Sequence, residues 1–355
     1  MTQQLDLTAY RLLGRSGLRV SPLALGTMTF GNDWGWGADE TESRRVFDAY
    51  VDRGGNFVDT ANAYTNGTSE RLVGEFAQGR RERLVISTKY TMATRPGDPN
   101  SGGNHRKSMV VSVEESLRRL KSDYIDLLYV HQWEGLTPTE EVLRGLDDLV
   151  RQGKVLYIGL SDIQAWQASR MQVIADLRGW TPFVALQSEY SLVERTPERD
   201  LIPMSRELGL GFMPWAPLAN GVLSGKYSRA DLGAQQEGVH GTRKAIASGY
   251  GSLSERSLKI ADVVAEVAKE TGRSSAQIAL AWLFTQRGVT APLLGARTLD
   301  QLENNLGAFE VSFSDDQLKR LDTVSAIELG FPHTLLRGPF VQQAVTGGTR
   351  WPERV

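Results

Sequence analysis

Short runs of apolar and β-branched residues alternate with longer amphipathic stretches along most of the chain. The short runs predict buried strands, and the longer stretches have the residue spacing of helices. The predicted strands are residues 23–27, 56–60, 84–89, 125–131, 155–160, 183–187, 210–215 and 290–294. The predicted helices are residues 39–53, 69–78, 107–121, 138–152, 163–177, 197–208, 254–287 and 298–309. Each predicted strand is thus followed by a helix.

This alternation favours an α/β fold in which eight parallel strands close into a (β/α)8 TIM barrel. An open doubly wound sheet is the alternative. Residues 10–20 precede the first strand and predict an N-terminal β-hairpin that turns between Gly14 and Gly17 and could plug the barrel floor. No linker divides the chain, so we expect residues 1–355 to form a single domain.

Three segments are too long to be simple connections, namely residues 91–106, 216–252 and 327–355. Long loops in compact domains usually carry function. The first two segments follow strands, so in a barrel they would be long loops at the C-terminal face, where active sites form.

Composition narrows the class of protein. A hydrophobic fraction of 41% and a charged fraction of 23% are typical of a folded globular chain. The formal net charge of −2 argues against nucleic-acid binding, and the absence of cysteine excludes disulfides and thiolate sites. The amino terminus lacks the apolar core of a signal peptide, and no segment has the ~20 apolar residues of a membrane span. We therefore expect a cytoplasmic protein.

Polar side chains follow three consecutive predicted strands at the end where a barrel opens. Asp59 ends the second strand, Lys89 the third and His131 the fourth, while Tyr64 lies in the loop that leaves the second. Each residue alone has an ordinary structural explanation as a cap, surface or packing group. Because the carboxyl ends of barrel strands share one mouth, we expect the four to converge on a catalytic site.

These four groups could polarise and protonate a carbonyl. The Lys89 ammonium would favour the anion of the Tyr64 phenol and so make the phenol acidic enough to act near neutral pH. Asp59 would offset the cost of burying the Lys89 charge. His131 could donate a hydrogen bond to the carbonyl oxygen. A site of this kind also needs a hydride donor.

Several motifs, in order, resemble the aldo-keto reductase superfamily over nearly the whole chain. They are G-T-M at 26–28, N-F-V-D-T-A-N-A-Y at 56–64, S-T-K at 87–89, D-Y-I-D-L-L-Y-V-H at 123–131, L-V-R-Q-G-K-V-L-Y-I-G-L-S at 149–161 and L-L-G-A-R at 293–297. The chain looks closest to the bacterial branch related to aryl-alcohol dehydrogenases and potassium-channel β-subunits. The resemblance implies that Asp59, Tyr64, Lys89 and His131 form the family's tetrad, with Tyr64 as the general acid in reduction.

The chain lacks the glycine-rich motifs of the common nucleotide-binding folds. The resemblance instead implies that NADPH or NADP+ lies extended across the barrel mouth. The residues implied at the nicotinamide end are Gly26, Thr27, Met28, Asp59, Ser161, Gln187 and Trp215. Those implied along the pyrophosphate lie in residues 216–227 and are Pro217, Leu218, Gly221, Leu223, Gly225 and Lys226.

The remaining cofactor contacts would come from the start of the last predicted helix. A helix amino terminus attracts anions, and Arg297 could bind a ribose 2′-phosphate through paired hydrogen bonds, which favours NADPH over NADH. The other implied contacts are Gly295, Gln301 and Asn305. The chain departs from the family pattern at Asn304, which replaces a common glutamate, and at Asp162, where the family often has Asn.

Aromatic residues near the predicted mouth indicate an apolar or aromatic carbonyl substrate. Besides Tyr64, the candidates for substrate contact are Phe30, Trp34, Trp36 and Trp133. The terminal stretch with Phe331, His333 and Phe340 could fold over this pocket. His105 has no assigned role.

Two other classes of function stay open at this stage. The chain could be an NADPH-binding regulatory or redox-sensor subunit with little turnover, as channel β-subunits are. A barrel metallohydrolase is disfavoured because the four histidines, His105, His131, His240 and His333, lack paired metal-ligand spacing, so we expect no metal. The only partner that we expect is the small carbonyl substrate. The sequence does not decide whether the chain forms a homo-oligomer.

Overall fold

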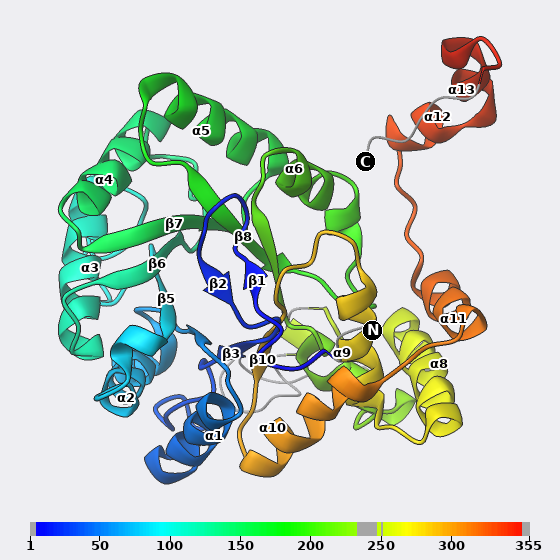
Figure 1. Ribbon diagram of the computed structural model, residues 1–355, viewed down its shortest axis with the longest axis horizontal. Coiled ribbons are helices and arrows are strands. Elements are labelled where there is room, and N and C mark those ends of the chain that lie inside the picture. The colour runs from blue at the N-terminus through cyan, green and yellow to red at the C-terminus, as the bar shows by residue number, and fades with distance from the viewer. Residues whose placement is uncertain (1–4, 233–246, 250, 350–355) are drawn as a thin grey trace.

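The computed structural model describes residues 5–232, 247–249 and 251–349, and its centre is an eight-stranded parallel sheet ringed by helices (Figure 1). The strand order is β10-β3-β4-β5-β6-β7-β8-β9. The strands are β3 (Ala24–Gly26), β4 (Phe57–Asp59), β5 (Val85–Tyr90), β6 (Ile125–Val130), β7 (Val155–Ser161), β8 (Phe183–Glu189), β9 (Gly211–Trp215) and β10 (Leu293–Gly295). All eight predicted strands are confirmed.

The first and last strands of this order meet and nearly close the barrel. Just before β10, Val289 forms a parallel bridge with Phe212 of β9. The Thr290 N–H also donates a hydrogen bond of 2.8 Å to the Phe212 carbonyl. The fold is therefore a (β/α)8 barrel, and the alternative of an open doubly wound sheet is wrong.

Helices follow the strands as the sequence predicts, with one prominent exception. The principal helices are α1 (Glu40–Asp52), α2 (Thr68–Phe76), α3 (Arg106–Leu120), α4 (Thr139–Arg151), α5 (Ala165–Arg178), α6 (Leu201–Glu207), α8 (Glu255–Thr271), α9 (Ser275–Thr285), α10 (Leu299–Leu306) and α11 (Asp315–Ser325). The prediction of one helix over 254–287 is wrong. Gly272 ends α8 in the left-handed region at φ 66°, and the Ser274 side chain caps α9 by accepting a hydrogen bond from the Gln277 N–H.

Side chains along each strand alternate between two hydrophobic clusters. In β4, β5 and β6, Val58, Ile86 and Leu128 face outward and pack in the cluster that includes the helices. Their neighbours face inward and form a second cluster inside the barrel, which includes Phe57, Val85 and Leu127. Because strand side chains repeat every second residue, positions two or four beyond the inward residues also face the barrel interior.

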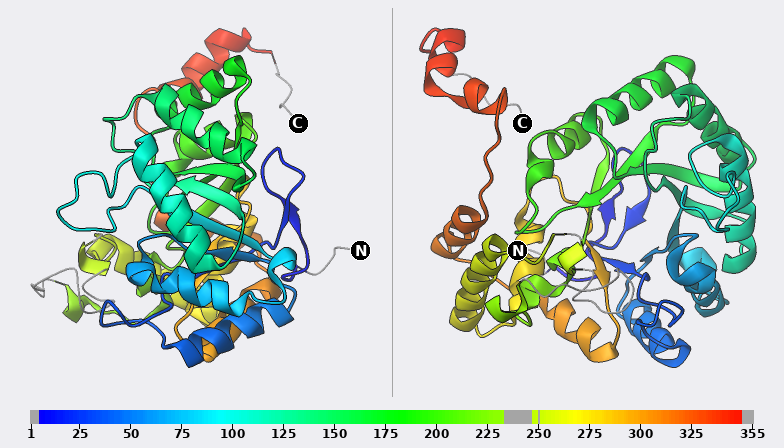
Figure 2. Two further views of the ribbon diagram at one scale, coloured as in Figure 1. Left: turned by 90° about the vertical axis from the view of Figure 1, so that its left-hand side faces the viewer. Right: turned by 180° about the vertical axis from the view of Figure 1, so that it is seen from behind.

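The predicted amino-terminal hairpin closes the barrel floor. Its strands are β1 (Arg11–Leu12) and β2 (Arg19–Val20), and Leu13 and Val20 are fully buried in the inner cluster. A side chain at Gly14 would collide with the Val184 carbonyl, so only glycine permits this close approach. The hairpin lies at the end of the barrel opposite the loops that follow the strands (Figure 2, left).

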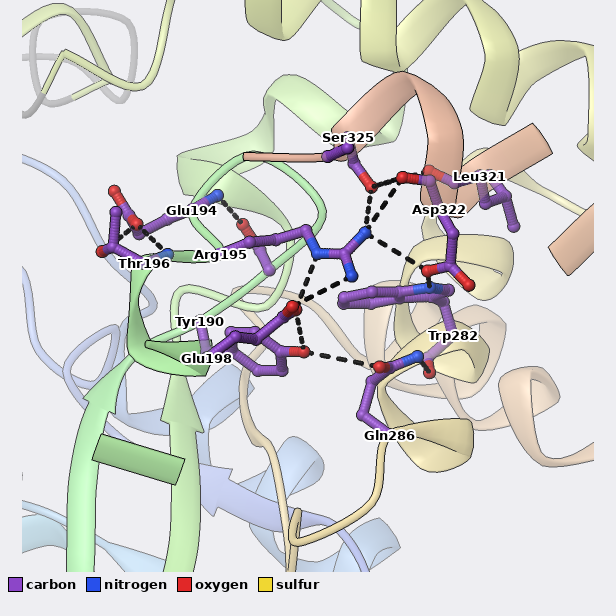
Figure 3. A network of polar contacts seen from close by, with 12 residues as sticks. Tyr190, Glu194, Arg195, Thr196, Glu198, Trp282, Gln286, Leu321, Asp322 and Ser325 are labelled. Atoms are coloured by element: carbon purple, nitrogen blue, oxygen red, sulfur yellow. Dashed lines mark hydrogen bonds and ion pairs between the residues drawn. The ribbon is translucent and has the colours of Figure 1, made fainter. Parts of the chain in front are cut away.

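A polar network fastens the last barrel helices to the segment after β8 (Figure 3). Arg195 Nε donates to Glu198 at 2.6 Å, and its Nη1 donates to Ser325 Oγ at 2.8 Å. Asp322 of α11 accepts from both Arg195 Nη1, at 3.2 Å, and Trp282 Nε1 of α9, at 3.1 Å. With only 12% of the Arg195 side chain exposed, this network holds α11 against the barrel.

Beyond α11 the chain leaves the barrel. Residues 326–332 lead to two short helices, α12 (His333–Arg337) and α13 (Pro339–Thr346), that project away from the barrel (Figures 1 and 2). Phe331 and Phe340 are 83% and 81% exposed, and His333 lies 3.3 Å from Asp200 at the start of α6. The prediction that this stretch covers the pocket is wrong for the residues described, and 350–355 lie outside them. Among the described residues, no helix combines the length and apolar character that a membrane span requires.

Candidate active site

A cavity of about 590 Å³ opens at the carboxyl ends of the barrel strands. It extends from the ends of β4 and β6 to the start of α10, and its wall includes the segment after β9. The residues predicted for the site that line this cavity are Gly26, Met28, Asp59, Tyr64, His131, Ser161, Gln187, Trp215, Pro217, Leu218, Gly221, Lys226, Gly295, Arg297, Gln301 and Asn305. Its size is that of a small-molecule site.

The tetrad predicted from the sequence assembles at the inner end of this cavity. Lys89 Nζ donates to Asp59 Oδ2 at 2.5 Å, to the Thr60 carbonyl at 2.8 Å and to the Tyr64 hydroxyl at 3.3 Å. The rings of Tyr64 and His131 meet edge to face with centroids 5.9 Å apart. Lys89 is fully buried behind the cavity wall, whereas Tyr64 and His131 line the cavity.

The strand period explains why these side chains meet. Asp59 lies two residues beyond the inward-facing Phe57, and Lys89 lies four beyond Val85. His131 lies four beyond the inward-facing Leu127. Each polar group therefore continues an inward-facing row at the point where its strand reaches the mouth.

Tyr64 is held by a tight loop instead of a strand. It begins a 3₁₀ segment, η1 (Tyr64–Gly67), in which Thr65 and Asn66 adopt left-handed backbone angles, φ 46° and 56°. The Thr65 hydroxyl donates to the Phe30 carbonyl at 2.8 Å and accepts from the Ser69 N–H at 3.0 Å. Such backbone strain persists only where surrounding contacts hold it, and here it aims the phenol at Lys89.

The electrostatics of the site set the charge of each group. Burial alone lowers the pKa of the Lys89 ammonium, but Asp59 and Tyr64 raise it by more, so Lys89 stays charged at neutral pH. Burial, with the Lys89 charge adding to it, holds the pKa of the His131 imidazole well below its ordinary value. His131 is therefore neutral, and its buried Nδ1 has no hydrogen-bond partner among the described residues.

The pKa of the Tyr64 phenol differs from the prediction. Burial raises the pKa of Tyr64 above its ordinary value, and the Lys89 charge opposes this shift without reversing it. The prediction that Lys89 makes the phenol acidic is therefore wrong for this structure, because desolvation outweighs the nearby charge. Tyr64 remains protonated near neutral pH, which is the form that can give a proton to an oxygen atom.

The opposite wall of the cavity has polar groups that suit an amide-bearing ring. Ser161 is buried, and its hydroxyl has no hydrogen-bond partner among the described residues. Gln187 Nε2 donates to Asp59 Oδ1 at 3.0 Å, and the Asp162 carboxylate accepts from Trp215 Nε1 at 2.9 Å. An unpartnered buried hydroxyl and a half-buried indole that line the same cavity fit the carboxamide and ring of a nicotinamide.

The far end of the cavity has the cationic groups expected for phosphate. Arg297 and Lys226 both line it, from the start of α10 and from the segment after β9. The Arg297 N–H donates to Gln301 Oε1 at 2.9 Å, and Thr298 caps the helix by accepting from the Gln301 N–H. The residues of this end therefore fit a phosphorylated cofactor.

Several predicted contacts lie away from the cavity surface. Thr27, Phe30 and Leu223 are fully buried, and Phe30 packs on Phe76 with centroids 6.3 Å apart. Trp133 lines a separate depression with Trp166 of α5. Phe30 and Trp133 are thus not placed to touch a substrate in this cavity.

The other aromatic candidates cluster beside the phenol. Trp34 meets the Tyr64 ring edge to face at 6.5 Å, and Trp36 packs against Trp34 at 5.7 Å. Gly225, which was predicted as a pyrophosphate contact, ends the 3₁₀ segment η4 (Ala219–Ser224) with φ 77°. Of the four aromatic candidates besides Tyr64, Trp34 is therefore the one that contacts the phenol.

Some contributors were not identified from the sequence. Ser87 Oγ donates to Asp59 Oδ1 at 2.7 Å, and Met92 and Gln132 line the cavity near His131. Ser87 could have been found, because it lies two residues before Lys89 in the same inward row. His105, which had no predicted role, caps α3 by accepting a hydrogen bond at Nδ1 from the Ser108 N–H.

Comparison of the sequence with known proteins finds one matching family and several similar proteins. Residues 22–326 match the aldo/keto reductase family. A norsolorinic acid reductase of Aspergillus flavus is 38% identical over 338 residues, 92% of this chain and 84% of that protein. An aryl-alcohol dehydrogenase [NADP(+)] of Phanerodontia chrysosporium is 36% identical over 355 residues, 95% of this chain and 91% of that protein. A putative aryl-alcohol dehydrogenase of Saccharomyces cerevisiae is 34% identical, covering 93% and 90% of the two chains.

Proposed function

Since the chain belongs to the aldo/keto reductase family and is an oxidoreductase, we propose that it reduces an aldehyde or ketone to the alcohol with NADPH, and that Tyr64 is the general acid. The observation that carries the proposal is the contact of the Lys89 ammonium with the hydroxyl of a protonated Tyr64 at the inner end of an open cavity.

NADPH bound in the cavity would supply the hydride. Ser161, Gln187, Trp215 and Arg297 line the cavity. The first three would contact the nicotinamide end, and Arg297 would bind the 2′-phosphate. The similarity to a dehydrogenase whose name specifies NADP(+) supports the choice of the phosphorylated cofactor.

The residues of the chain account for the proton. The Tyr64 hydroxyl gives its proton to the carbonyl oxygen as negative charge develops there. Lys89, 3.3 Å away, stabilises the phenolate that is left, and Asp59 keeps the ammonium compensated throughout. The neutral His131 can donate one hydrogen bond to the same oxygen, which orients the carbonyl and shares its charge.

The cavity wall favours an apolar or aromatic substrate. Its lining includes Met28, Met92 and Trp215, and Trp34 packs against the Tyr64 phenol. These side chains offer large flat or polarisable surfaces and no cation to pair with an acid group. Names of similar proteins, aryl-alcohol dehydrogenase and norsolorinic acid reductase, are in keeping with an aromatic substrate.

The test is an assay of NADPH oxidation with 4-nitrobenzaldehyde and a panel of aromatic and aliphatic carbonyl compounds. We expect catalytic turnover that is faster with aromatic aldehydes than with aliphatic ones of similar size. A protein that binds NADPH tightly but oxidises it with no member of the panel would instead be a redox-sensor subunit, and the proposal would be overturned.

A further inference from the structure

An acidic side chain lies in the cavity wall beside the indole of Trp215. Asp162 follows β7, lines the cavity and accepts a hydrogen bond from Trp215 Nε1 at its Oδ1, 2.9 Å away. Its backbone is left-handed at φ 43°, and its N–H donates to the Gln187 carbonyl at 3.2 Å. Among non-glycine residues, Asp and Asn adopt this backbone conformation most readily. An amide would therefore have satisfied the same position, yet the chain has a carboxyl group there.

The charge of Asp162 acts across the cavity. Its carboxylate interacts electrostatically with the Lys89 ammonium and with the Tyr64 phenol, which come from the opposite wall. A charge that influences both of these groups also influences any charge placed between them and Trp215. The reacting ring of a nicotinamide has to lie in that space, because its hydride must reach the carbon whose oxygen Tyr64 protonates.

We propose that Asp162, beyond holding Trp215, sets the relative affinity of the site for the two redox forms of the nicotinamide. The ring of NADP+ bears a positive charge that the ring of NADPH lacks, so an ionised Asp162 stabilises the oxidised form selectively. A protonated Asp162 bears no charge and therefore does not favour NADP+ over NADPH. This inference rests on the proposed function, and it assigns the residue a role in the direction of the reaction.

The change in preference falls near neutral pH. Desolvation at the cavity wall raises the pKa of Asp162 to about 6, although the residue itself is exposed, and the hydrogen bond from Trp215 and the Lys89 charge oppose that shift. Glu189 of β8 also interacts electrostatically with Asp162, and its pKa is raised to about 7 by burial and by repulsion from Glu194 and Asp162. Above pH 6 the site should favour NADP+ and alcohol oxidation more strongly than it does below pH 6.

The experiment measures the dissociation constants of NADP+ and NADPH from the whole protein, by quenching of tryptophan fluorescence, between pH 5.5 and 8, a range from about half a unit below the Asp162 pKa to about two units above it. The quantity of interest is the ratio of the two constants. The 2′-phosphate also titrates, with a pKa of about 6, but it is common to both forms and cancels in the ratio. For the wild type we expect the ratio to shift toward NADP+ by about fivefold or more across this range.

Variants separate the charge from the hydrogen bond. Asp162→Asn keeps an oxygen that can accept from Trp215 Nε1 and tolerates the backbone conformation, so it should bind both forms with a pH-independent ratio. Glu189→Gln is the matched control, because it removes a neighbouring acid but should keep the pH dependence. Asp162→Ala should weaken both forms together through loss of the Trp215 contact.

A wild-type ratio that does not change with pH, or an equal change in Asp162→Asn, would overturn this inference while leaving the proposed function intact. If neither NADP+ nor NADPH binds to the wild type, both proposals fail.

Discussion

The Lys89 ammonium lies 3.3 Å from the Tyr64 hydroxyl and 4.8 Å from the centre of its ring. The same ammonium lies 2.5 Å from Asp59, with no exposure to solvent. A charged amine in this position can stabilise a phenolate only once the proton has left, because burial keeps the resting phenol protonated. The pair is thus arranged to assist proton donation.

Replacing Tyr64 with Phe should lower turnover with an aromatic aldehyde by about 10²-fold or more, the usual contribution of a general acid. NADPH binding should be retained, because the ring and the groups along the cofactor wall remain. Steady-state kinetics and fluorescence titration check the two parts. Tyr124→Phe, at a phenol that stacks on Arg81 away from the cavity, is the control and should behave as wild type. Full turnover in Tyr64→Phe would remove the phenol from the mechanism.

Replacing Lys89 with Met should abolish turnover and destabilise the fold by about 3–5 kcal/mol, because Asp59 would be left as an uncompensated buried charge. The double variant Asp59→Asn with Lys89→Met should regain most of the lost stability, since no charge is then stranded, but no activity. Denaturant unfolding measures the stabilities. Equal destabilisation in the single and double variants would show that packing, and not charge, dominates at this pair.

Replacing Arg297 with Ala should weaken NADPH binding about 10- to 100-fold, the loss of a charged hydrogen-bond pair to phosphate, with little effect on NADH. Calorimetric titration with both cofactors measures the difference. Arg287→Ala removes an exposed arginine beyond the end of α9 and serves as the control. Parallel losses for NADPH and NADH would assign Arg297 to some other part of the cofactor.

Glu189 should make stability depend on pH. Burial is the main cause that raises the pKa of Glu189 from 4.5 to about 7. Between pH 4.5 and 7, Glu189 therefore keeps its proton in the folded protein but has lost it in the unfolded chain. This contribution to stability is therefore largest below pH 4.5, falls as pH rises toward 7 and stays low above it. Glu189→Gln should raise the melting temperature by roughly 2–4 °C at pH 8, for a gain of about 1 kcal/mol, and by nothing at pH 4. Thermal unfolding at both values, with the exposed Glu82→Gln as control, is the measurement; a gain of equal size at pH 4 would contradict it.

The barrel and most of the tetrad were predictable because they depend on local regularities. Alternation of buried strands and amphipathic helices gave the eight units, and the two-residue period of a strand places Asp59, Lys89 and His131 in inward-facing rows. Even the break between α8 and α9 had a local signal, Gly272 followed by the capping Ser274. Apolar spacing alone predicted a single helix over 254–287, because that spacing does not include the two signals that end one helix and begin the next.

Other features depend on how distant segments pack, and no local pattern encodes that. Phe30 follows a strand end as Trp34 does, yet one is buried against Phe76 while the other reaches Tyr64. The carboxyl of Asp162 meets an indole 53 residues away, and residues beyond α11 leave the barrel instead of covering its mouth. The sequence determined the fold and the kinds of group at the mouth, because backbone period and burial follow from neighbouring residues. Tertiary structure alone decided which side chains share a desolvated space, and desolvation outweighed the nearest charge in setting the pKa of Tyr64.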